Sequence, residues 1–528
     1  MSIEPVLIAG EWRASKSSGV FTSINPTTMQ PLAAQFPISQ WADCDAALDA
    51  ANEAAIALRG TKPEAIAQFL EDYAARIEAA KSELVDIAFE ETALAKAPRL
   101  SEVELPRTTG QLRQAAAAVR NGSWAMPTID TKTGIRSMFG PLGPVIVFGP
   151  NNFPFAFGSV SGGDFAAAIA AGNPVIGKAN TSHPATTKLF AQIAQKSIAA
   201  TGLHPATVQM IYRTSHTYGE KLVADPRVGA TGYTGSRLAG LKLKAAADAA
   251  GKPIYLELSS VNPVVILPGA LEERAADIAT EFTGSCLAGT GQMCTNPGLV
   301  ILPKSPAAEA FIADMSKRFE SAPVGTLLSP RVAESLKESV EVLQKAGAQV
   351  VAGGNPGGGA GASHSNTLLR ASGDHFIKNA HALQTEAFGN ASLFVLAESI
   401  EQTIQVIDSL EGNLTGCVYS SKSGSDDAAY DKIAPHLRQK VGRMLNDKMP
   451  TGVAVTAAMN HGGPYPATGH PGFTAVGIPT AIHRFGMLQC YDNVRSHRLP
   501  WLLQNKNPTG KTWRYIDGEW TTSDVTGA

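Results

Sequence analysis

Hydrophobic residues recur along the chain with two different spacings. In residues 39–120 they follow a helical spacing, which predicts several amphipathic helices that serve packing rather than chemistry. The clearest repeat in that stretch is formed by Ile66, Phe69, Leu70, Tyr73 and Ile77. Residues 6–15 instead read as a short hairpin that turns at Gly10, and residues 515–523 resemble them. We interpret these two segments as independent hairpins, because a repeat architecture would need more copies.

Short apolar segments alternate with helical patterns between about residues 142 and 260. The predicted strands lie at 144–148, 174–178, 207–212, 228–233 and 254–258. This alternation predicts a mostly parallel sheet that helices cover on both faces. Ligands of such sheets bind at the carboxyl ends of the strands.

A second α/β region is predicted from about residue 261 to 460. Its strands are expected near 264–267, 299–302 and 392–395, and its glycine-rich stretch at 353–361 is expected to be an exposed loop. The tail from about residue 480 contains aromatic side chains that are difficult to bury within one subunit, so an oligomer contact is expected there. These aromatic residues are Tyr491, Trp501, Trp513, Tyr515 and Trp520.

Length, charge and cysteine content narrow the class of protein. A chain of 528 residues is too long for one core, so two or three domains are expected. The formal net charge of −2 and the absence of a Lys/Arg cluster argue against nucleic-acid and anionic-membrane partners. No uncharged apolar run reaches the roughly 18 residues that a membrane span needs. Five scattered cysteines and an N-terminus without a secretory pattern predict a cytoplasmic location.

One stretch, residues 291–298, combines a cysteine with the ends of two expected elements. Cys294 follows a small-residue, helix-like approach and precedes a Pro/Gly turn. Backbone amides at such a position can point at the sulfur and lower its pKa, which would make Cys294 a nucleophile. The alternative is that Cys294 is a small buried hydrophobic residue, as most free cysteines are.

Four further segments combine with Cys294 into a specific pattern. They lie at 148–154, 178–184, 232–240 and 256–263. Asn-Phe-Pro, Lys-x-x-Thr, Thr-Gly-Ser-x-x-x-Gly, Glu-Leu-x-x-x-Asn-Pro, Gly-Gln-x-Cys and Glu-x-Phe-Gly occur in this order. With these motifs the chain resembles the aldehyde dehydrogenase superfamily over nearly its full length.

The resemblance implies an aldehyde dehydrogenase-like α/β fold. It divides the chain into a Rossmann-type dinucleotide-binding domain, residues 1–122 and 142–260, and a catalytic domain, residues 261–478, that carries the nucleophilic cysteine. An oligomerisation hairpin and tail would comprise residues 123–141 and 479–528. The expected assembly is a homodimer or homotetramer.

Three residues match the catalytic positions of the family. Cys294 would attack the aldehyde and form a thiohemiacetal, and the side-chain amide of Asn152 would stabilise the oxyanion together with the backbone N–H of Cys294. Glu257 would activate the water that hydrolyses the thioester. Taken singly, Asn152 could be a turn residue and Glu257 a solvated carboxylate at a strand end. No metal site is expected.

The resemblance also implies a nicotinamide cofactor, NADP or NAD. Lys178 matches the residue that holds the adenosine ribose or its phosphate. Gly235, Ser236 and Gly240 match the turn and helix N-terminus beside the pyrophosphate. Glu386 and Phe388 match the pair at the nicotinamide ribose and ring, although Phe388 could be plain core packing.

A departure from the family pattern bears on the choice between NADP and NAD. Members that prefer NAD usually have Glu where this chain has Thr181, and the neutral hydroxyl removes the repulsion that a 2′-phosphate would meet. The arginine that NADP-using relatives supply falls at His216, with Arg213 nearby, which leaves the phosphate contact open. We expect NADP, with NAD as the alternative.

The substrate is expected only by analogy with one branch of the superfamily. The pair Ser259-Ser260, where many members have Gly-Gly, and residues 460–468 resemble fatty aldehyde and 2-oxoglutarate semialdehyde (2,5-dioxopentanoate) dehydrogenases. No arginine can be assigned from the sequence as a clamp for a substrate carboxylate. Three alternatives remain: an aromatic aldehyde as substrate, acyl transfer to coenzyme A, and a silent binding protein on the same fold. The presence of Glu257 with the other matched residues disfavours the last two.

Overall fold

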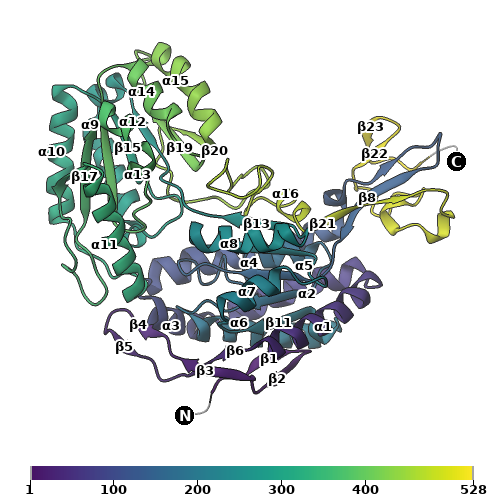
Figure 1. The fold of residues 1–528 in the computed structure, drawn as a ribbon. Helices are drawn as coiled ribbons and strands as arrows, with labels where there is room; N and C mark the ends of the chain where they lie inside the picture. The colour runs from purple at the N-terminus through teal and green to yellow at the C-terminus, as the bar shows by residue number, and fades with distance from the viewer. Residues whose placement is uncertain (1–2, 526–528) are drawn as a thin grey trace.

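Three large β-sheets organise the protein, and the computed structural model describes residues 3–525 of it (Figure 1). The first two sheets lie in separate bodies, and the third forms an arm that projects from the first body. Two small two-stranded sheets near the N-terminus complete the β-structure of the described residues. They pair β3 (Ser17–Phe21) with β6 (Phe36–Ser39), and β4 (Ile24–Asn25) with β5 (Gln30–Pro31).

The first sheet has seven strands in the order β13-β12-β9-β10-β11-β1-β2. Strands β9 to β13 run parallel, as the alternating pattern predicts, and the hairpin β1–β2 adds two antiparallel strands at one edge. Successive residues of β11 are all buried, so both faces of the sheet are covered. The strands are β1 (Val6–Ile8), β2 (Glu11–Arg13), β9 (Val145–Phe148), β10 (Val175–Lys178), β11 (Val208–Ile211), β12 (Ala230–Thr234) and β13 (Ile254–Glu257).

The predicted helices of the N-terminal half are present and build one core with the first sheet. The longer ones carry buried apolar residues at helical spacing, for example Ile66, Leu70 and Ile77 in α2. The helices are α1 (Trp41–Arg59), α2 (Pro63–Ala79), α3 (Lys81–Thr92), α4 (Leu105–Asn121), α5 (Gly163–Ala170), α6 (Pro184–Thr201), α7 (His216–Val223) and α8 (Arg237–Ala249), with a π-helical segment η1 (Lys96–Glu104) before α4.

The second sheet also has seven strands, in the order β16-β17-β18-β15-β14-β19-β20. All its neighbouring pairs are parallel except β16–β17, which is antiparallel. The three strands predicted for this region are β14 (Val264–Ile266), β15 (Leu299–Pro303) and β18 (Ala391–Ala397), and the structure adds β16 (Gln349–Ala352), β17 (Thr367–Ser372), β19 (Asn413–Tyr419) and β20 (Val441–Asn446). The glycine-rich stretch 353–361 is a mostly exposed loop, as predicted.

Helices pack around the second sheet and form two hydrophobic cores with it. They are α9 (Pro268–Leu287), α10 (Pro306–Ser321), α11 (Pro330–Lys345), α12 (Gly373–Lys378), α13 (Ala380–Leu383), α14 (Ile400–Asp408) and α15 (Asp427–Lys440). None of the helices in residues 3–525 combines the length and apolar character that crossing a membrane requires.

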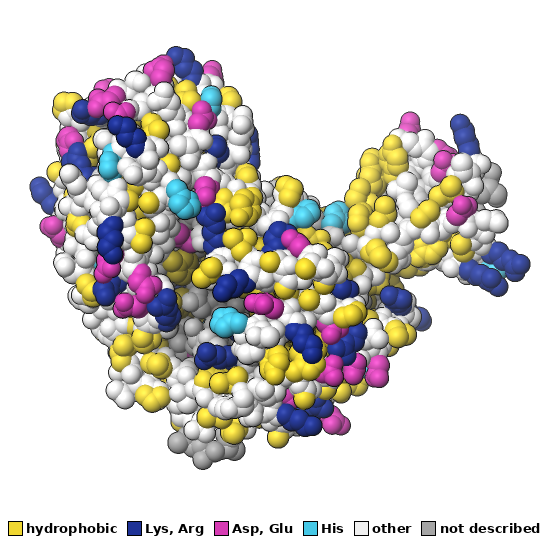
Figure 2. All heavy atoms as spheres, viewed as in Figure 1, with side chains coloured by type: hydrophobic (Ala, Val, Ile, Leu, Met, Phe, Trp, Pro, Cys, Tyr) yellow, Lys and Arg dark blue, Asp and Glu magenta, His cyan; other side chains and the backbone are white. Residues whose placement is uncertain are grey.

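The third sheet forms the arm and joins two distant parts of the chain. Its order is β21-β8-β7-β22-β23, so β21 is an edge strand. Figure 2 shows hydrophobic side chains gathered on the side of the arm that borders the open hollow next to the second body. The strands are β7 (Thr128–Ile129), β8 (Arg136–Pro141), β21 (Gly486–Tyr491), β22 (Arg514–Ile516) and β23 (Glu519–Thr521). The hairpins β1–β2 and β22–β23 belong to different sheets, which confirms that they are independent.

After the second sheet the chain returns to the first body. Thr468 forms an isolated β-bridge with Glu257 at the end of β13. Further along, Arg484, which follows the short helix α16 (Thr480–His483), donates a hydrogen bond of 2.7 Å to the buried carboxylate of Asp164 in α5. The first body is therefore built from chain on both sides of the second body.

Candidate active site

Cys294 lies in an irregular loop between a single 3₁₀ turn, Ala288–Gly291, and strand β15. Its sulfur is 3.3 Å from Nε2 of His461. The side-chain amide of Asn262 donates hydrogen bonds to the backbone carbonyls of Cys294, at 2.9 Å, and Asn296, at 2.8 Å. The loop is thus tied to the segment that follows β13, which fixes the sulfur at the junction of the two bodies.

Glu257 and His461 form a buried pair beside the sulfur. Nε2 of His461 is 2.9 Å from Oε1 of Glu257, and the two side chains are only 1–2% exposed. Oε2 of Glu257 has no hydrogen-bond partner among the described residues. Glu257 is therefore not the solvated strand-end carboxylate that the sequence left as an alternative, and its free oxygen remains able to accept a proton.

The prediction that backbone amides lower the pKa of the Cys294 thiol is wrong. Burial and the negative charge of Glu257 raise the pKa of the thiol well above its ordinary value, and the positive charge of Arg107 only partly opposes them. Helix α9 ends at Leu287, before the loop, so the end of this helix that precedes Cys294 is its C-terminus. Formation of a thiolate here requires a group that accepts the proton, and His461 is in contact with the sulfur.

Asn152 is held in the loop after β9 by contacts on both sides. Its Nδ2 donates one hydrogen bond, of 2.9 Å, to the carbonyl of Gln292, two residues before Cys294. Its own carbonyl accepts a hydrogen bond of 2.8 Å from Arg99. One side-chain N–H of Asn152 is therefore in use, and the second remains available for an oxyanion.

A buried ion pair supports this loop from the N-terminal helices. Arg99 pairs with Glu104, whose other oxygen accepts hydrogen bonds from the backbone N–H groups of Phe155 and Ala156 at 2.8 and 3.0 Å. The prediction that residues 39–120 serve packing only is wrong, because the π-helical segment before α4 reaches the loop that carries Asn152.

Four of the predicted cofactor residues line one cavity at the carboxyl ends of β10 to β12: Lys178, Thr181, Arg213 and His216. Burial and the nearby Arg213 lower the pKa of Lys178 to about 8. No acidic side chain forms an ion pair with Lys178 or Arg213 within residues 3–525. The lining holds three cationic side chains, Lys178, Arg213 and Lys242, against one carboxylate, Glu220, and this excess of positive charge favours an anionic ligand.

Gly235 and Ser236 line the same cavity, at the N-terminus of α8. No side chain among the described residues caps this helix, so its first N–H groups are available to an anion. Gly240 lies elsewhere, since it is inside α8 and packs against the first sheet. A Cβ at Gly240 would meet Leu258 at 2.5 Å and Tyr233 at 2.9 Å, so close helix packing explains this glycine.

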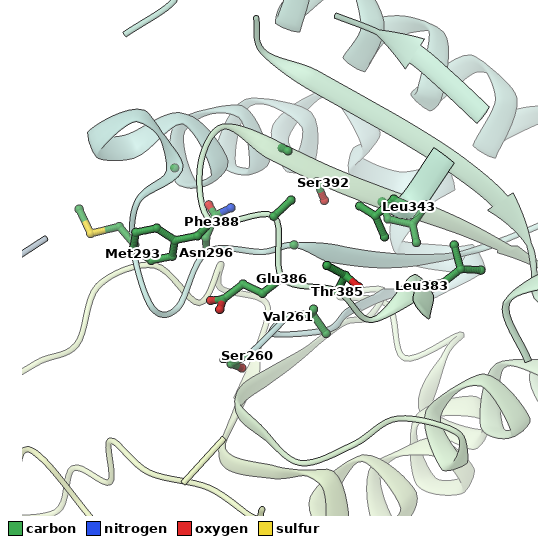
Figure 3. Close-up of a pocket in the computed structure, with 15 residues that line it drawn as sticks. Ser260, Val261, Met293, Asn296, Leu343, Leu383, Thr385, Glu386, Phe388 and Ser392 are labelled. Atoms are coloured by element: carbon green, nitrogen blue, oxygen red, sulfur yellow. The ribbon is translucent and has the colours of Figure 1, made fainter. Parts of the chain in front are cut away.

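A second cavity, of about 530 Å³, extends from Ser236 to Cys294 and includes Glu386 and Phe388. Figure 3 shows Glu386 and Phe388 with Met293 along the wall of a smaller adjoining pocket. Burial raises the pKa of Glu386 to about 7, against hydrogen bonds from the Ser259 side chain and the Ser260 backbone that lower it. Cys294 also opens onto a third cavity, of about 620 Å³, on the side away from the cofactor residues.

His461 and Arg107, which also lines that third cavity, were not assigned a role from the sequence. His461 lies in the segment 460–468 that the sequence analysis used only as a branch marker. The sequence of α4 does contain a pattern that could have drawn attention to Arg107. Polar residues recur at helical spacing beside its apolar positions, at Arg107, Gln111 and Gln114. Their side chains donate hydrogen bonds to the backbone carbonyls of Val453, Ala156 and Val455, respectively.

Glu257, Cys294 and His461 also form a donor set whose ligand atoms lie within 4.8 Å of one another. A carboxylate, a thiol and an imidazole are all known metal ligands. The prediction that the site holds no metal stays a prediction, and metal analysis of the purified protein would test it.

Comparison with known sequences places the chain among oxidoreductases that act on aldehydes. The profile described as the aldehyde dehydrogenase family matches residues 12–463. An alpha-ketoglutaric semialdehyde dehydrogenase from Azospirillum brasilense is 35% identical over 520 residues, covering 96% of this chain and 98% of the relative. A protein of the same name from Acinetobacter baylyi is 34% identical over 518 residues, covering 96% and 97%. The resemblance stated from the motifs is confirmed.

Solved structures confirm the predicted fold. Aldehyde dehydrogenase C of Pseudomonas syringae, solved as a mutant with NAD⁺ and octanal, superposes with a TM-score of 0.78 at 20% identity, covering 93% of this chain and 96% of that one. Lactaldehyde dehydrogenase of Escherichia coli gives 0.78 at 21% identity, covering 93% and 98%.

Proposed function

The chain belongs to the aldehyde dehydrogenase family, and on that premise we propose that it oxidises an aldehyde to the carboxylic acid with Cys294 as nucleophile, Glu257 as base and NADP or NAD as oxidant. The contact chain from the Cys294 sulfur through Nε2 of His461 to Glu257, at 3.3 and 2.9 Å, carries this proposal. It brings together a nucleophile, a proton acceptor and a carboxylate between two cavities.

In the first step, His461 in the tautomer that carries its proton on Nδ1 accepts the thiol proton of Cys294 on Nε2, and the new Nε2–H then donates to Oε1 of Glu257, whose carboxylate stabilises the imidazolium. The thiolate then attacks the aldehyde carbon and gives a thiohemiacetal. The free side-chain N–H of Asn152 and the backbone N–H of Cys294 bind the oxyanion. His461 thereby provides the proton acceptor that the Cys294 thiol needs because its pKa is raised.

The residues of the first cavity fit a dinucleotide. Lys178 and Arg213 would hold the phosphate or ribose of the adenosine half, and the open N-terminus of α8 at Ser236 would hold the pyrophosphate. Glu386 and Phe388 would contact the nicotinamide half beside Cys294. Held by these residues, the nicotinamide would supply a hydride acceptor for the thiohemiacetal carbon, and a thioester would then remain on Cys294.

Hydrolysis of that thioester needs a base, and Glu257 has a free carboxylate oxygen for it. This oxygen takes a proton from water, the resulting hydroxide attacks the thioester carbon, and the acid leaves as the Cys294 thiolate reforms. A buried Glu257 at the site favours this course over acyl transfer to coenzyme A. The intact set of Cys294, Asn152, Glu257 and Glu386 argues against a silent binding protein.

NADP is proposed as the preferred cofactor and NAD as the alternative. Thr181 places no negative charge at the adenosine end, where Lys178, Arg213 and His216 line the cavity. A 2′-phosphate beside Lys178 and Arg213 would meet two cations, and the one carboxylate that lines this cavity is that of Glu220. The Pseudomonas syringae protein was solved with NAD⁺, so both cofactors belong in the test.

The proposed substrate is 2-oxoglutarate semialdehyde, after the names of the relatives in Azospirillum brasilense and Acinetobacter baylyi. The protein is further proposed to act in the cytoplasm, which suits its five free cysteines, and to assemble as a homodimer or homotetramer through the arm. Met487 and Leu488 on the edge strand β21 are 49% and 62% exposed, which supports a contact there.

The function is tested by following NADPH or NADH formation with a panel of short, long, aromatic and carboxylated aldehydes. We expect turnover in the wild type and none in Cys294→Ala. Glu257→Gln should release one rapid burst of reduced cofactor and then little more, because only hydrolysis is blocked. Reduction of cofactor by Cys294→Ala would refute the mechanism, and steady turnover in Glu257→Gln would remove that residue from hydrolysis.

A further inference from the structure

The cavity on the far side of Cys294 contains a buried cation with unused hydrogen-bond donors. Arg107 lies at the start of α4 and lines this cavity together with Cys294 and His461. Its Nη1 donates a hydrogen bond of 3.1 Å to the carbonyl of Val453. Its Nε and Nη2 are buried and have no partner in the described part of the chain. Unmet donors on a buried guanidinium are costly, so a ligand that supplies acceptors would be favoured there.

The walls of the cavity explain why no protein group neutralises Arg107. The other residues that line it are mostly apolar, and none of them is Asp or Glu in residues 3–525. The nearest buried acids are already engaged, Glu104 with Arg99 and Glu257 with His461. The guanidinium carbon lies 5.7 and 5.1 Å from the ring centres of Phe153 and Phe157. These rings shield Arg107 from water, which strengthens its attraction for an anion.

The position of Arg107 is fixed by the segment that it contacts. Residues 450–455 have no regular secondary structure. Arg443 donates hydrogen bonds to the carbonyls of Pro450 and Gly452 at 2.6 and 3.0 Å, and Gln114 of α4 donates to that of Val455. The bond from Arg107 to Val453 lies between these anchors, so the guanidinium is held before any ligand arrives.

We propose that Arg107 is the substrate-specificity residue of this site and binds the carboxylate at the far end of a short semialdehyde while its aldehyde carbon faces Cys294. The inference rests on the proposed aldehyde oxidation and names the substrate class. The edge formed by Nε and Nη2 matches the two oxygens of a carboxylate. The rings of Phe153 and Phe157 would pack on the methylene groups between the two ends of the substrate.

A neutral aldehyde of equal length would leave the donors of Arg107 unmet in a dry cavity. Sites built to hydrogen-bond a substrate group reject analogues that lack it far more strongly than they reject a missing methylene. We therefore expect kcat/KM for 5-oxopentanoate and 2,5-dioxopentanoate to exceed that for pentanal by at least about 100-fold.

The decisive experiment compares kcat/KM for these aldehydes in the wild type, Arg107→Gln, Arg107→Lys and Arg113→Gln. Arg113 is the matched control, because it lies on the same helix but pairs with Glu78 at the surface. Arg107→Gln should lower kcat/KM for the two carboxylated substrates about 100-fold and bring their preference over pentanal to within about fivefold. Arg107→Lys should fall between, and Arg113→Gln should keep the wild-type preference.

Competition in the wild type provides a test that does not depend on any variant. Glutarate should inhibit competitively against pentanal, and glutaramide should inhibit at least tenfold more weakly. Cys294-dependent oxidation of pentanal that equals that of 5-oxopentanoate, or an unchanged preference in Arg107→Gln, would overturn the assignment of Arg107 and leave the aldehyde oxidation standing. Failure of the wild type to oxidise any aldehyde would overturn both.

Discussion

His461 lies between a thiol that must lose its proton and a carboxylate that can stabilise the charge that results. In the structure its Nε2 contacts both groups, and the pKa of the Cys294 thiol is raised by burial and by Glu257. Transfer of the thiol proton to the imidazole would let the thiolate form even though burial and Glu257 raise the pKa of the thiol. This arrangement differs from a cysteine activated by backbone amides alone.

His461→Gln should therefore lower kcat/KM near pH 7 about 100-fold and move the rising limb of the pH profile to higher pH, because the thiol must then ionise without a proton acceptor. Measurement of kcat/KM between pH 6 and 10 checks this. His470→Gln is the control, since that histidine is exposed and its ring packs on Tyr255 instead. A pH profile of His461→Gln that coincides with the wild type would contradict the prediction.

Lys178 predicts a pH dependence that distinguishes the two cofactors. Its pKa is lowered to about 8, so the side chain is a cation below that pH and loses its charge as the pH rises through it. Attraction for a 2′-phosphate is thus present at pH 7 and weakened at pH 9, and the KM for NADP should rise several-fold over this interval. The KM for NAD, which lacks the phosphate, should change less. Equal pH dependence for both cofactors would exclude Lys178 as the phosphate contact.

Sequence motifs located Cys294, Asn152 and Glu257 because each lies in a short local pattern whose chemistry is readable. The raised pKa of Cys294 was not predictable, because it arises from burial and from a charge that the fold brings close. His461 and Arg107 reach the site through contacts with residues 167 to 346 positions away in the chain. Sequence periodicity records only contacts between near neighbours.

Among the elements, the strands of the first sheet follow from the sequence, whereas several of the second sheet do not. Strand β9 is an apolar run between Pro144 and Gly149, and β10 begins directly after Pro174, which is a clear pattern. Strands β19 and β20 contain polar residues such as Thr415 and Arg443, whose side chains are engaged by Asn262 and by carbonyls of residues 450–452. Tertiary partners thus permit polar residues where the sequence pattern calls for apolar ones.

A carboxylate from outside the helix caps the N-terminus of helix α9, which leads to the Cys294 loop. Asp426 accepts hydrogen bonds from the backbone N–H groups of Gly269, Ala270 and Ser421, at 2.8 to 2.9 Å. Asp426→Ala would leave these donors without a partner and should lower the melting temperature by roughly 5–10 °C. Thermal unfolding measures the shift, and Asp427→Ala is the control because Asp427 is exposed. Equal melting temperatures for both variants would contradict it.

At the scale of the whole molecule, the arm exposes several large apolar side chains, among them Met487, Leu488, Trp513 and Trp520. Within residues 3–525 its edge strand β21 pairs with β8 alone, and it carries the exposed Leu488. Leu488→Asp should shift the protein to a smaller assembly, because a charge would have to be buried in the proposed contact. Light scattering after size-exclusion chromatography measures this. Ile56→Asp, at an exposed site on α1, should leave the mass unchanged, and an unchanged mass for Leu488→Asp would exclude β21 from the contact.

The buried pair of Asp164 and Arg484 joins residues 320 positions apart, and this separation has a consequence during protein synthesis. All strands of the first sheet have been synthesised once the chain reaches residue 257, yet the buried carboxylate of Asp164 then still lacks Arg484, its partner from the last tenth of the chain. His461 arrives almost as late. A nascent or prematurely ended chain that stops before residue 461 contains Cys294 and Glu257 without the imidazole between them. On the proposed mechanism, copies that end before residue 461 would oxidise the aldehyde far more slowly than the whole polypeptide does.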